Sequence, residues 1–299
     1  MPVPLRGEWA LLSVKGTRVN SADRTLPGSE VSCSGAVGES ALRQHQAPEP
    51  NGSTKGSAVE KHEPMFNLQR AVLAVLGAMV AVQVIRMALP EAADSWLTLA
   101  LAFIPARYSG YASLLPGGEI ASITSFVTHT LVHGDWVHLG FNAAWLVAFG
   151  GAVANRVGTV RFLLLFAFCA IIGAATFLVF NIGLLAPMVG ASGAISGLMG
   201  ATMRFLFTAV DGNGLAALRE DPRSARLMPL AETLRDKRVV LVTAVFLLAN
   251  ILAILGLGSM GYSGIAWEAH IGGYFAGLLA FGFFDAPQTE DSSGERILH

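Results

Sequence analysis

The sequence predicts an all-α membrane protein, a bundle of six transmembrane helices, from three observations. Charged residues make up 14% of the 299 residues, against about 25% in soluble proteins. Hydrophobic residues make up 53%, and the mean hydropathy is +0.54, which indicates a chain whose main solvent is lipid. Six separate apolar segments also approach the roughly 20 residues that a membrane-spanning helix needs.

The two ends of the chain differ from the rest. Residues 1–63 are polar, with seven basic and seven acidic residues and no sustained apolar period. Such a segment buries too little surface to offset its ordering entropy, so we expect a disordered tail. Met65 directly precedes the first apolar segment and is an alternative start of the chain. Residues 64–286 are expected to form the membrane domain and residues 287–299 a short polar tail.

The apolar segments are the expected transmembrane helices, and the first connection between them is long. The segments are residues 67–89, 136–155, 160–182, 191–210, 239–258 and 266–284. The connection at residues 90–130 holds aromatic side chains that suit the membrane–water interface, namely Trp96, Phe103, Tyr108 and Tyr111. We therefore expect this long loop to lie in the outer headgroup region.

Basic residues in the connections predict the orientation in the membrane. The connections after the second and fourth segments contain most of these basic residues, namely Arg156, Arg161, Arg219, Arg223, Arg226, Arg235, Lys237 and Arg238. The alternate connections, 183–190 and 256–266, have none, and residues 90–130 have only Arg107. Because connections rich in Lys and Arg stay in the cytoplasm, both termini are expected to be cytoplasmic.

Polar side chains inside apolar segments are candidate functional residues. They form three sets: His129, His133, His138 and Asn142 leading into the second segment, Gly190, Ser192 and Gly193 at the start of the fourth, and His270, Gly273 and Gly277 in the sixth. At 1.5 Å per helical residue, counted from a charged residue at the inner end of each helix, Ser192, His270 and Asn142 lie about 12, 8 and 9 Å below the outer face. Side chains of three helices can therefore meet in the outer third of the bilayer.

A serine and a histidine at one depth indicate a nucleophile and its general base, because a serine hydroxyl must lose its proton to attack a carbonyl. Gly190 and Gly193 allow close backbone approach to Ser192, whose helix N-terminus favours developing negative charge. His138 and Asn142 are four residues apart, so they share one helical face and can donate to an oxyanion.

Structural interpretations of the same residues stay open. Gly193 with Gly197, and Gly273 with Gly277, form small-xxx-small patterns that are typical of transmembrane helix packing. His129 and His133 can be structural or interfacial residues. A metal site is not expected, since the chain has no His-Glu-x-x-His pattern. Cys33 and Cys169 are the two cysteines, too few for a disulfide framework.

Three motifs occur in this order along the chain: His129-x3-His133-x4-His138-x3-Asn142, Gly190-x-Ser192-Gly193 and Ala269-His270-x-x-Gly273-x-x-x-Gly277. Together with the six expected helices, they resemble the rhomboid family of intramembrane serine proteases over residues 66–284. The resemblance implies a bundle with an outward-opening cavity above a short fourth helix. It also implies a cofactor-free Ser–His dyad, with Ser192 as nucleophile and His270 as general base. The Ser192 amide, His138 and Asn142 would form the oxyanion hole, and Gly273 and Gly277 would be packing positions.

The sequence departs from the family pattern at two places. A Trp-Arg pair, common in the family before the first histidine, is replaced by Thr124 and Ser125. The aromatic residue common one turn after the nucleophile is Ser196. Neither departure removes a reacting group, but the anchors of the first loop and of the His270 ring are left unassigned.

The function expected from these observations is hydrolysis of a peptide bond near the outer end of another protein's transmembrane segment, in a bacterial plasma membrane. The partners would be transmembrane substrates and the lipid bilayer. A net charge of −1 predicts no nucleic-acid partner. One alternative is a proteolytically inactive rhomboid-like protein that binds or chaperones membrane clients. A transporter or proton pathway is the other, but it would need mid-membrane acids and inverted repeats, which the sequence does not show.

Overall fold

The computed structural model describes residues 69–212, 214, 223–254 and 266–285. Within these ranges all regular elements are helices, and the extended pairing is a single bridge between Phe103 and Met188. The predicted all-α class is confirmed. The predicted tails, residues 1–63 and 287–299, and the alternative start at Met65 lie outside the described residues.

Helices occupy each of the six expected spans. The bounds are α1 (Arg70–Ala88), α4 (Trp136–Trp145) continued by a π-helical turn (Leu146–Gly150) and α5 (Gly151–Val157), α6 (Thr159–Phe180), α7 (Ser192–Thr202) with α8 (Leu206–Gly212), α11 (Lys237–Ile254) and α12 (Trp267–Phe284). By length and composition, three described stretches can each cross a membrane, namely residues 70–88, 136–157 and 159–180. The bent pair α7–α8 can form a fourth crossing.

The connection at residues 90–130 is helical rather than an irregular loop. It contains α2 (Glu91–Leu101), two 3-10 turns (Pro105–Ser109 and Ala112–Leu114) and α3 (Gly118–Thr128), and a third turn (His129–Leu131) follows. Trp96 and Tyr111 are exposed, as an interfacial segment requires, but Phe103 is fully buried. Its ring packs against Phe126 at a centroid distance of 4.8 Å. Phe103 therefore packs inside the segment instead of facing outward, and the depth of the segment in the membrane stays a prediction.

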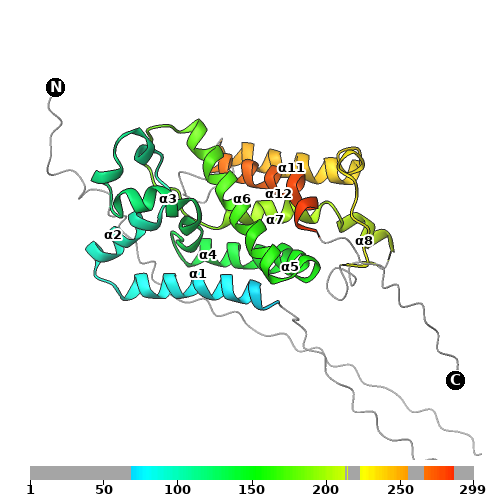
Figure 1. Cartoon of the computed structure of the whole chain (residues 1–299), viewed down its shortest axis with the longest axis horizontal. Helices are drawn as coiled ribbons and strands as arrows, with labels where there is room; N and C mark the ends of the chain where they lie inside the picture. Colours follow the sequence, from blue (N-terminus) through cyan, green and yellow to red (C-terminus); the bar gives the residue numbers. More distant parts are fainter. Residues whose placement is uncertain (1–68, 213, 215–222, 255–265, 286–299) are drawn as a thin grey trace, which may run out of the picture. The chain divides into compact units, whose positions relative to one another are not determined.

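Helices α6, α7 and α12 each pack against the other two, and Figure 1 shows them close together. The small residues of α7 allow close backbone approach. A Cβ atom at Gly197 would lie 2.9 Å from the carbonyl oxygen of Gly273, and one at Gly277 would overlap the carbonyl oxygen of Gly197. Without a hydrophobic driving force between helices in lipid, such close van der Waals contact is a main source of helix association. Glycines thus determine the spacing of α7 and α12.

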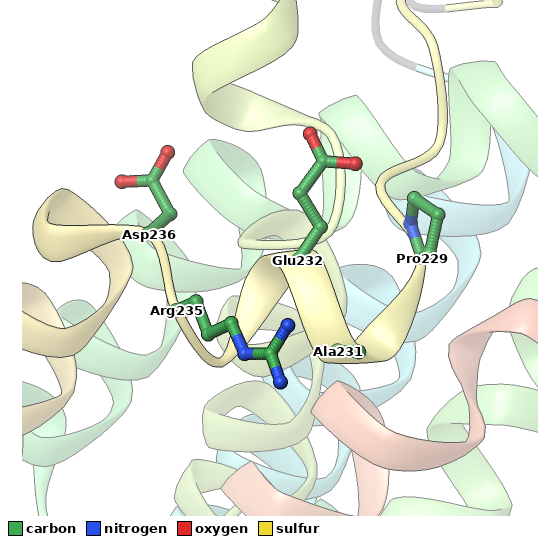
Figure 2. Close-up of a pocket in the computed structure, with 5 residues that line it drawn as sticks. All are labelled: Pro229, Ala231, Glu232, Arg235 and Asp236. Atoms are coloured by element: carbon green, nitrogen blue, oxygen red, sulfur yellow. The ribbon is translucent and has the colours of Figure 1, made fainter.

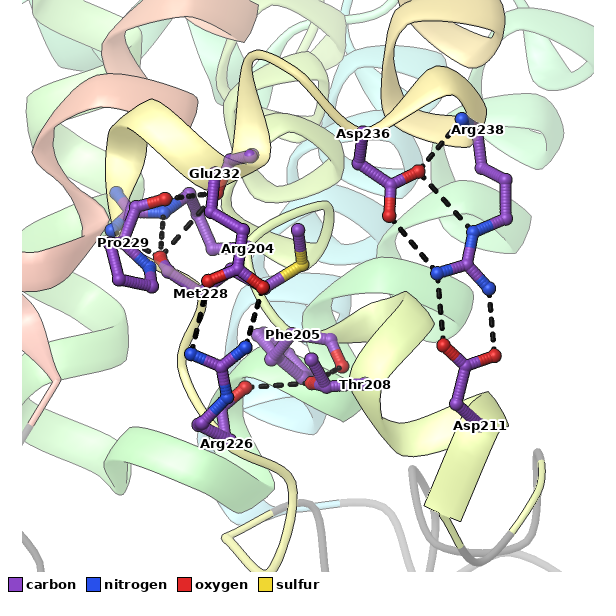
Figure 3. Close-up of polar contacts among 11 residues, drawn as sticks. Arg204, Phe205, Thr208, Asp211, Arg226, Met228, Pro229, Glu232, Asp236 and Arg238 are labelled. Carbon is purple, nitrogen blue, oxygen red and sulfur yellow. Dashed lines mark hydrogen bonds and ion pairs between the residues drawn. The ribbon is translucent and has the colours of Figure 1, made fainter.

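The fourth span bends by 44° between α7 and α8, near the buried side chain of Arg204. This guanidinium donates to the carbonyl oxygens of Met228, at 3.0 and 2.9 Å, and of Leu278, at 3.1 Å. Figure 3 shows Arg204 beside Met228, which lies on the connection that leads to α10 (Leu230–Thr233) and α11. Through Arg204, the bend is therefore hydrogen-bonded to the connection before α10 and to α12.

Several of the basic residues that predict the orientation form ion pairs at this end of the bundle. Arg156 at the end of α5 makes two contacts with Asp285 after α12, of 3.0 and 2.8 Å. Arg238 lies between Asp211 of α8 and Asp236, as Figure 3 shows. Hydrogen bonds from Arg238 hold the pKa of Asp236 below its ordinary value. The first pair joins the ends of α5 and α12, and Arg238 joins the ends of α8 and α11.

Candidate active site

Ser192 is the first residue of α7, at the end opposite Arg204. Gly190 precedes it with a φ of +114°, a backbone conformation that residues with a Cβ rarely adopt. The amide of Gly190 donates to the carbonyl oxygen of His129 at 2.9 Å. The turn into α7 is thereby tied to the histidine-rich segment, and the half-buried Ser192 lies at a helix N-terminus, where backbone amides point at negative charge.

His270 lies in the first turn of α12 and contacts Ser192 directly. Its Nε2 atom is 2.7 Å from Oγ of Ser192, a normal hydrogen-bond distance. The close approach of the two helices at Gly193 makes this contact possible, since a Cβ at Gly193 would lie 3.2 Å from the carbonyl oxygen of Ala269. Two residues that are 78 positions apart in the chain therefore lie within the contact distance that a serine nucleophile and its general base would need.

The other ring nitrogen of His270 contacts a residue that the sequence analysis did not single out. Nδ1 lies 3.0 Å from Oδ1 of Asn250 on α11. Asn250 is buried, and it is an amide side chain in an apolar segment. A polar side chain in an apolar segment could have identified Asn250 as a candidate site residue, because polar side chains in transmembrane helices usually face a partner.

His138 lies on α4, where the side chain of Asp135 caps the helix by accepting from the His138 amide at 2.8 Å. A Cβ at Gly190 would lie 2.8 Å from Nε2 of His138 and 3.9 Å from Oγ of Ser192, so both groups border the same point. Nδ1 of His138 accepts from the Gly134 amide at 3.4 Å. A neutral ring with Nδ1 as acceptor carries its proton on Nε2, and this N–H can donate toward the site.

Asn142 is buried one turn after His138, as expected, but its amide group is engaged within the helix. Its Nδ2 atom donates to the carbonyl oxygen of His138 at 2.9 Å, and its buried Oδ1 has no partner among the described residues. An amide nitrogen carries two hydrogens, so a second donor remains. The contact with the backbone of His138 also makes Asn142 a support for the turn that carries this ring.

His129 and His133 make contacts around the site rather than with the Ser192–His270 pair. Nδ1 of the buried His129 lies 2.8 Å from the carbonyl oxygen of Ser125. The ring of His133 is fully buried and packs against that of His138, with centroids 5.1 Å apart. The carbonyl oxygen of His133 accepts from Arg86 at 2.6 Å, so α1 is tied to the start of α4.

The anchor of the first connection, which the sequence left unassigned, is Arg107. This buried guanidinium donates to the carbonyl oxygens of Leu99 at 2.7 Å and Pro116 at 2.8 Å. Leu99 lies on α2, and Pro116 lies directly before α3, so one side chain holds the two helices of the connection. Thr124 and Ser125, which replace the Trp-Arg pair, lie on α3. Arg107 could have been singled out as a lone charge among apolar neighbours.

A separate surface hollow of about 490 Å³ lies near the Arg204 end of α7, not at the Ser192 end. It is lined by Pro229, Ala231, Glu232, Arg235 and Asp236, on α10 and the chain beside it, as Figure 2 shows. These side chains include no nucleophile with a neighbouring base. The hollow belongs to the connection before α11 and is distinct from the serine site.

Comparison with known families gives one match that covers the region of the site. A family model described as a Rhomboid domain matches residues 121–286, which is more than half of the chain. The match begins within α3 and includes Ser125, His138, Asn142, Ser192, Asn250 and His270. No curated protein matches the chain.

Proposed function

We propose that this chain, which belongs to the rhomboid family, is an intramembrane serine endopeptidase that cleaves the transmembrane segments of other proteins. The family and the apolar helices make the chain an integral membrane protein. The observation that carries the proposal of proteolysis is the 2.7 Å contact between Oγ of Ser192 and Nε2 of His270. Family members without activity exist, so this pair of reacting groups is the feature that favours an enzyme.

In the first half of the reaction, Oγ of Ser192 attacks the peptide carbonyl carbon while its proton passes to Nε2 of His270. The carbonyl oxygen becomes an oxyanion, to which the Ser192 amide and the Nε2–H of His138 would donate. The C–N bond then breaks, and the leaving amine takes the proton from Nε2 of His270. The acyl group remains on Ser192 as an ester.

In the second half, His270 removes a proton from water, which attacks the ester carbonyl. The same donors stabilise the second oxyanion. The ester bond breaks, Oγ of Ser192 regains the proton from Nε2, and the carboxylic acid product leaves. The half-buried position of Ser192 is consistent with a site that water reaches from one side.

Cleavage would occur on the non-cytoplasmic side, near the outer end of the substrate segment. The dyad lies at one end of α7 and α12, whereas Arg204 and the Arg156–Asp285 pair lie at the other ends of these helices. The basic end would face the cytoplasm under the positive-inside rule. Suitable substrates would have small or helix-weakening residues there, since a helical backbone shields its carbonyl carbons.

The test is cleavage of a generic transmembrane reporter by the full chain purified in detergent. Ser192→Ala and His270→Ala should each abolish cleavage while expression and membrane insertion persist, because the two groups act as one unit. A fluorophosphonate should label Ser192 in the wild type and not in Ser192→Ala. A well-folded wild-type protein that neither cleaves the reporter nor reacts with the probe would instead be a binding or chaperone member of the family.

A further inference from the structure

Asn250 is held so that only its carbonyl end faces the His270 ring. Nδ2 of Asn250 donates to the carbonyl oxygen of Phe246 at 2.8 Å, and Oδ1 lies 3.0 Å from Nδ1 of His270. Because the Phe246 oxygen can only accept, the amide nitrogen must face it, and the amide oxygen must face the ring. Asn250 is 6% exposed, so few other groups compete for this contact.

The orientation of the Asn250 amide determines where the neutral His270 ring carries its proton. An amide oxygen is an acceptor, so Nδ1 has to be the N–H donor. Nε2 then holds the lone pair, and it is Nε2 that lies 2.7 Å from Oγ of Ser192. The ring is therefore held in the tautomer that can accept the serine proton. The opposite tautomer would place an N–H against the serine hydroxyl.

Contacts between α11 and α12 keep Asn250 in place. Thr243 is hydrogen-bonded to the hydroxyl of Tyr274 at 2.6 Å, and Phe246 stacks on the Tyr274 ring at 4.7 Å. Thr243, Phe246 and Asn250 follow one another at helical spacing, so they lie on one side of α11. Val245 and Leu248 lie elsewhere on α11 and are exposed.

From these contacts we propose that Asn250 is a positioning residue of the active site, which orients His270 and selects its reactive tautomer. It also stabilises the imidazolium that forms when Nε2 takes the serine proton, because a hydrogen bond to a charged donor is stronger than one to a neutral donor. Asn250 thereby acts as the third member of a Ser–His–Asn arrangement, a role that an orienting residue has in other hydrolases. The inference rests on the proposed function for its kinetic consequences but not for the tautomer itself.

The kinetic test compares Asn250→Leu, which has similar volume and no acceptor, with the wild-type enzyme. Loss of a contact that strengthens in the transition state should lower kcat about 10- to 100-fold and leave KM within about twofold. Asn250→Asp restores an acceptor and should recover most of kcat at high pH. Its acidic limb should move to higher pH, because a carboxylate stabilises the protonated ring, which cannot accept the serine proton.

Tyr274→Phe is the matched control. It removes the hydrogen bond to Thr243 and keeps the aromatic stacking, so it weakens the docking of α11 without touching His270. Its kcat should stay within about threefold of the wild type. An equal loss in Asn250→Leu and Tyr274→Phe, or wild-type kcat in Asn250→Leu, would overturn the positioning role.

A spectroscopic arm separates this inference from the proposed function. In protein labelled with 15N-histidine, comparison with His270→Gln identifies the His270 signals among those of the seven histidines. The wild type should show His270 protonated at Nδ1, and Asn250→Leu should show a mixture of tautomers. A protein without protease activity that still shows this change would contradict the proposed function alone. A wild-type ring protonated at Nε2 would overturn the assignment of Asn250.

Discussion

Gly273→Ala tests whether the approach of two helices sets the geometry of the dyad. Gly273 lies on α12 three residues after His270, and a Cβ there would overlap the carbonyl oxygen of Gly193, the residue that follows Ser192. A carbon normally stays about 3.3 Å or more from a carbonyl oxygen, so the helices must separate locally by about 1 Å. The 2.7 Å contact between Ser192 and His270 would then lengthen to about 3.7 Å, beyond hydrogen-bond range.

A displacement of about 1 Å at reacting groups can cost about 100-fold in rate, so kcat for reporter cleavage should fall by about that factor. Overpacking should also lower the free energy of unfolding by about 1–3 kcal/mol, measured by thermal denaturation in detergent. Gly282→Ala on the same helix is the control, since its Cβ would lie 3.8 Å from the Arg204 side chain, an ordinary contact. A folded Gly273→Ala enzyme with the kcat of the Gly282→Ala protein would refute the reasoning.

Three further changes test Asn142 as a donor, the ion pair at the opposite ends of the helices and the anchor of the first connection. Asn142→Ala should lower kcat by a factor of about 10²–10³, with little change in KM, if the amide donates to the oxyanion. If Asn142 only supports the helix, the thermal stability should fall and the kcat of the folded protein should stay near that of the wild type. Arg156→Met removes the ion-pair partner of the largely buried carboxylate of Asp285 and should lower the free energy of unfolding by up to about 3–5 kcal/mol. An unchanged melting temperature would show that the pair is dispensable. Arg107→Met leaves the carbonyl oxygens of Leu99 and Pro116 without their buried donor, at a cost of about 1–3 kcal/mol each. The 90–130 segment should then be cleaved faster than in the wild type by limited proteolysis, and equal cleavage rates would argue against Arg107 as its anchor.

The positions of the membrane helices could be predicted from the sequence because their cause is local. Lipid requires a run of apolar residues of nearly constant length, and the expected spans, such as residues 160–182, agree with helices such as α6 (Thr159–Phe180) to within a few residues. The polar groups inside these runs were visible for the same reason, since each interrupts an apolar pattern. Counting residues along the helices also gave Ser192 and His270 similar depths before any contact was known.

Which polar groups meet was decided by the tertiary structure. Two residues at one depth touch only if both helices present them to each other, and that rotation depends on packing along the whole of α7 and α12, through Gly193, Gly273 and Gly277. The contact of Asn250 with His270 requires that a third helix, α11, is rotated so that Asn250 faces α12. The spacing of residues within α11 does not predict this rotation. In the sequence, Arg107 is only the one basic residue of the 90–130 connection. Its role as an anchor depends on the carbonyl oxygens of Leu99 and Pro116, which only the fold brings together. Hydropathy along the chain determines which segments lie in lipid, whereas side-chain packing between segments determines which atoms are close enough to react.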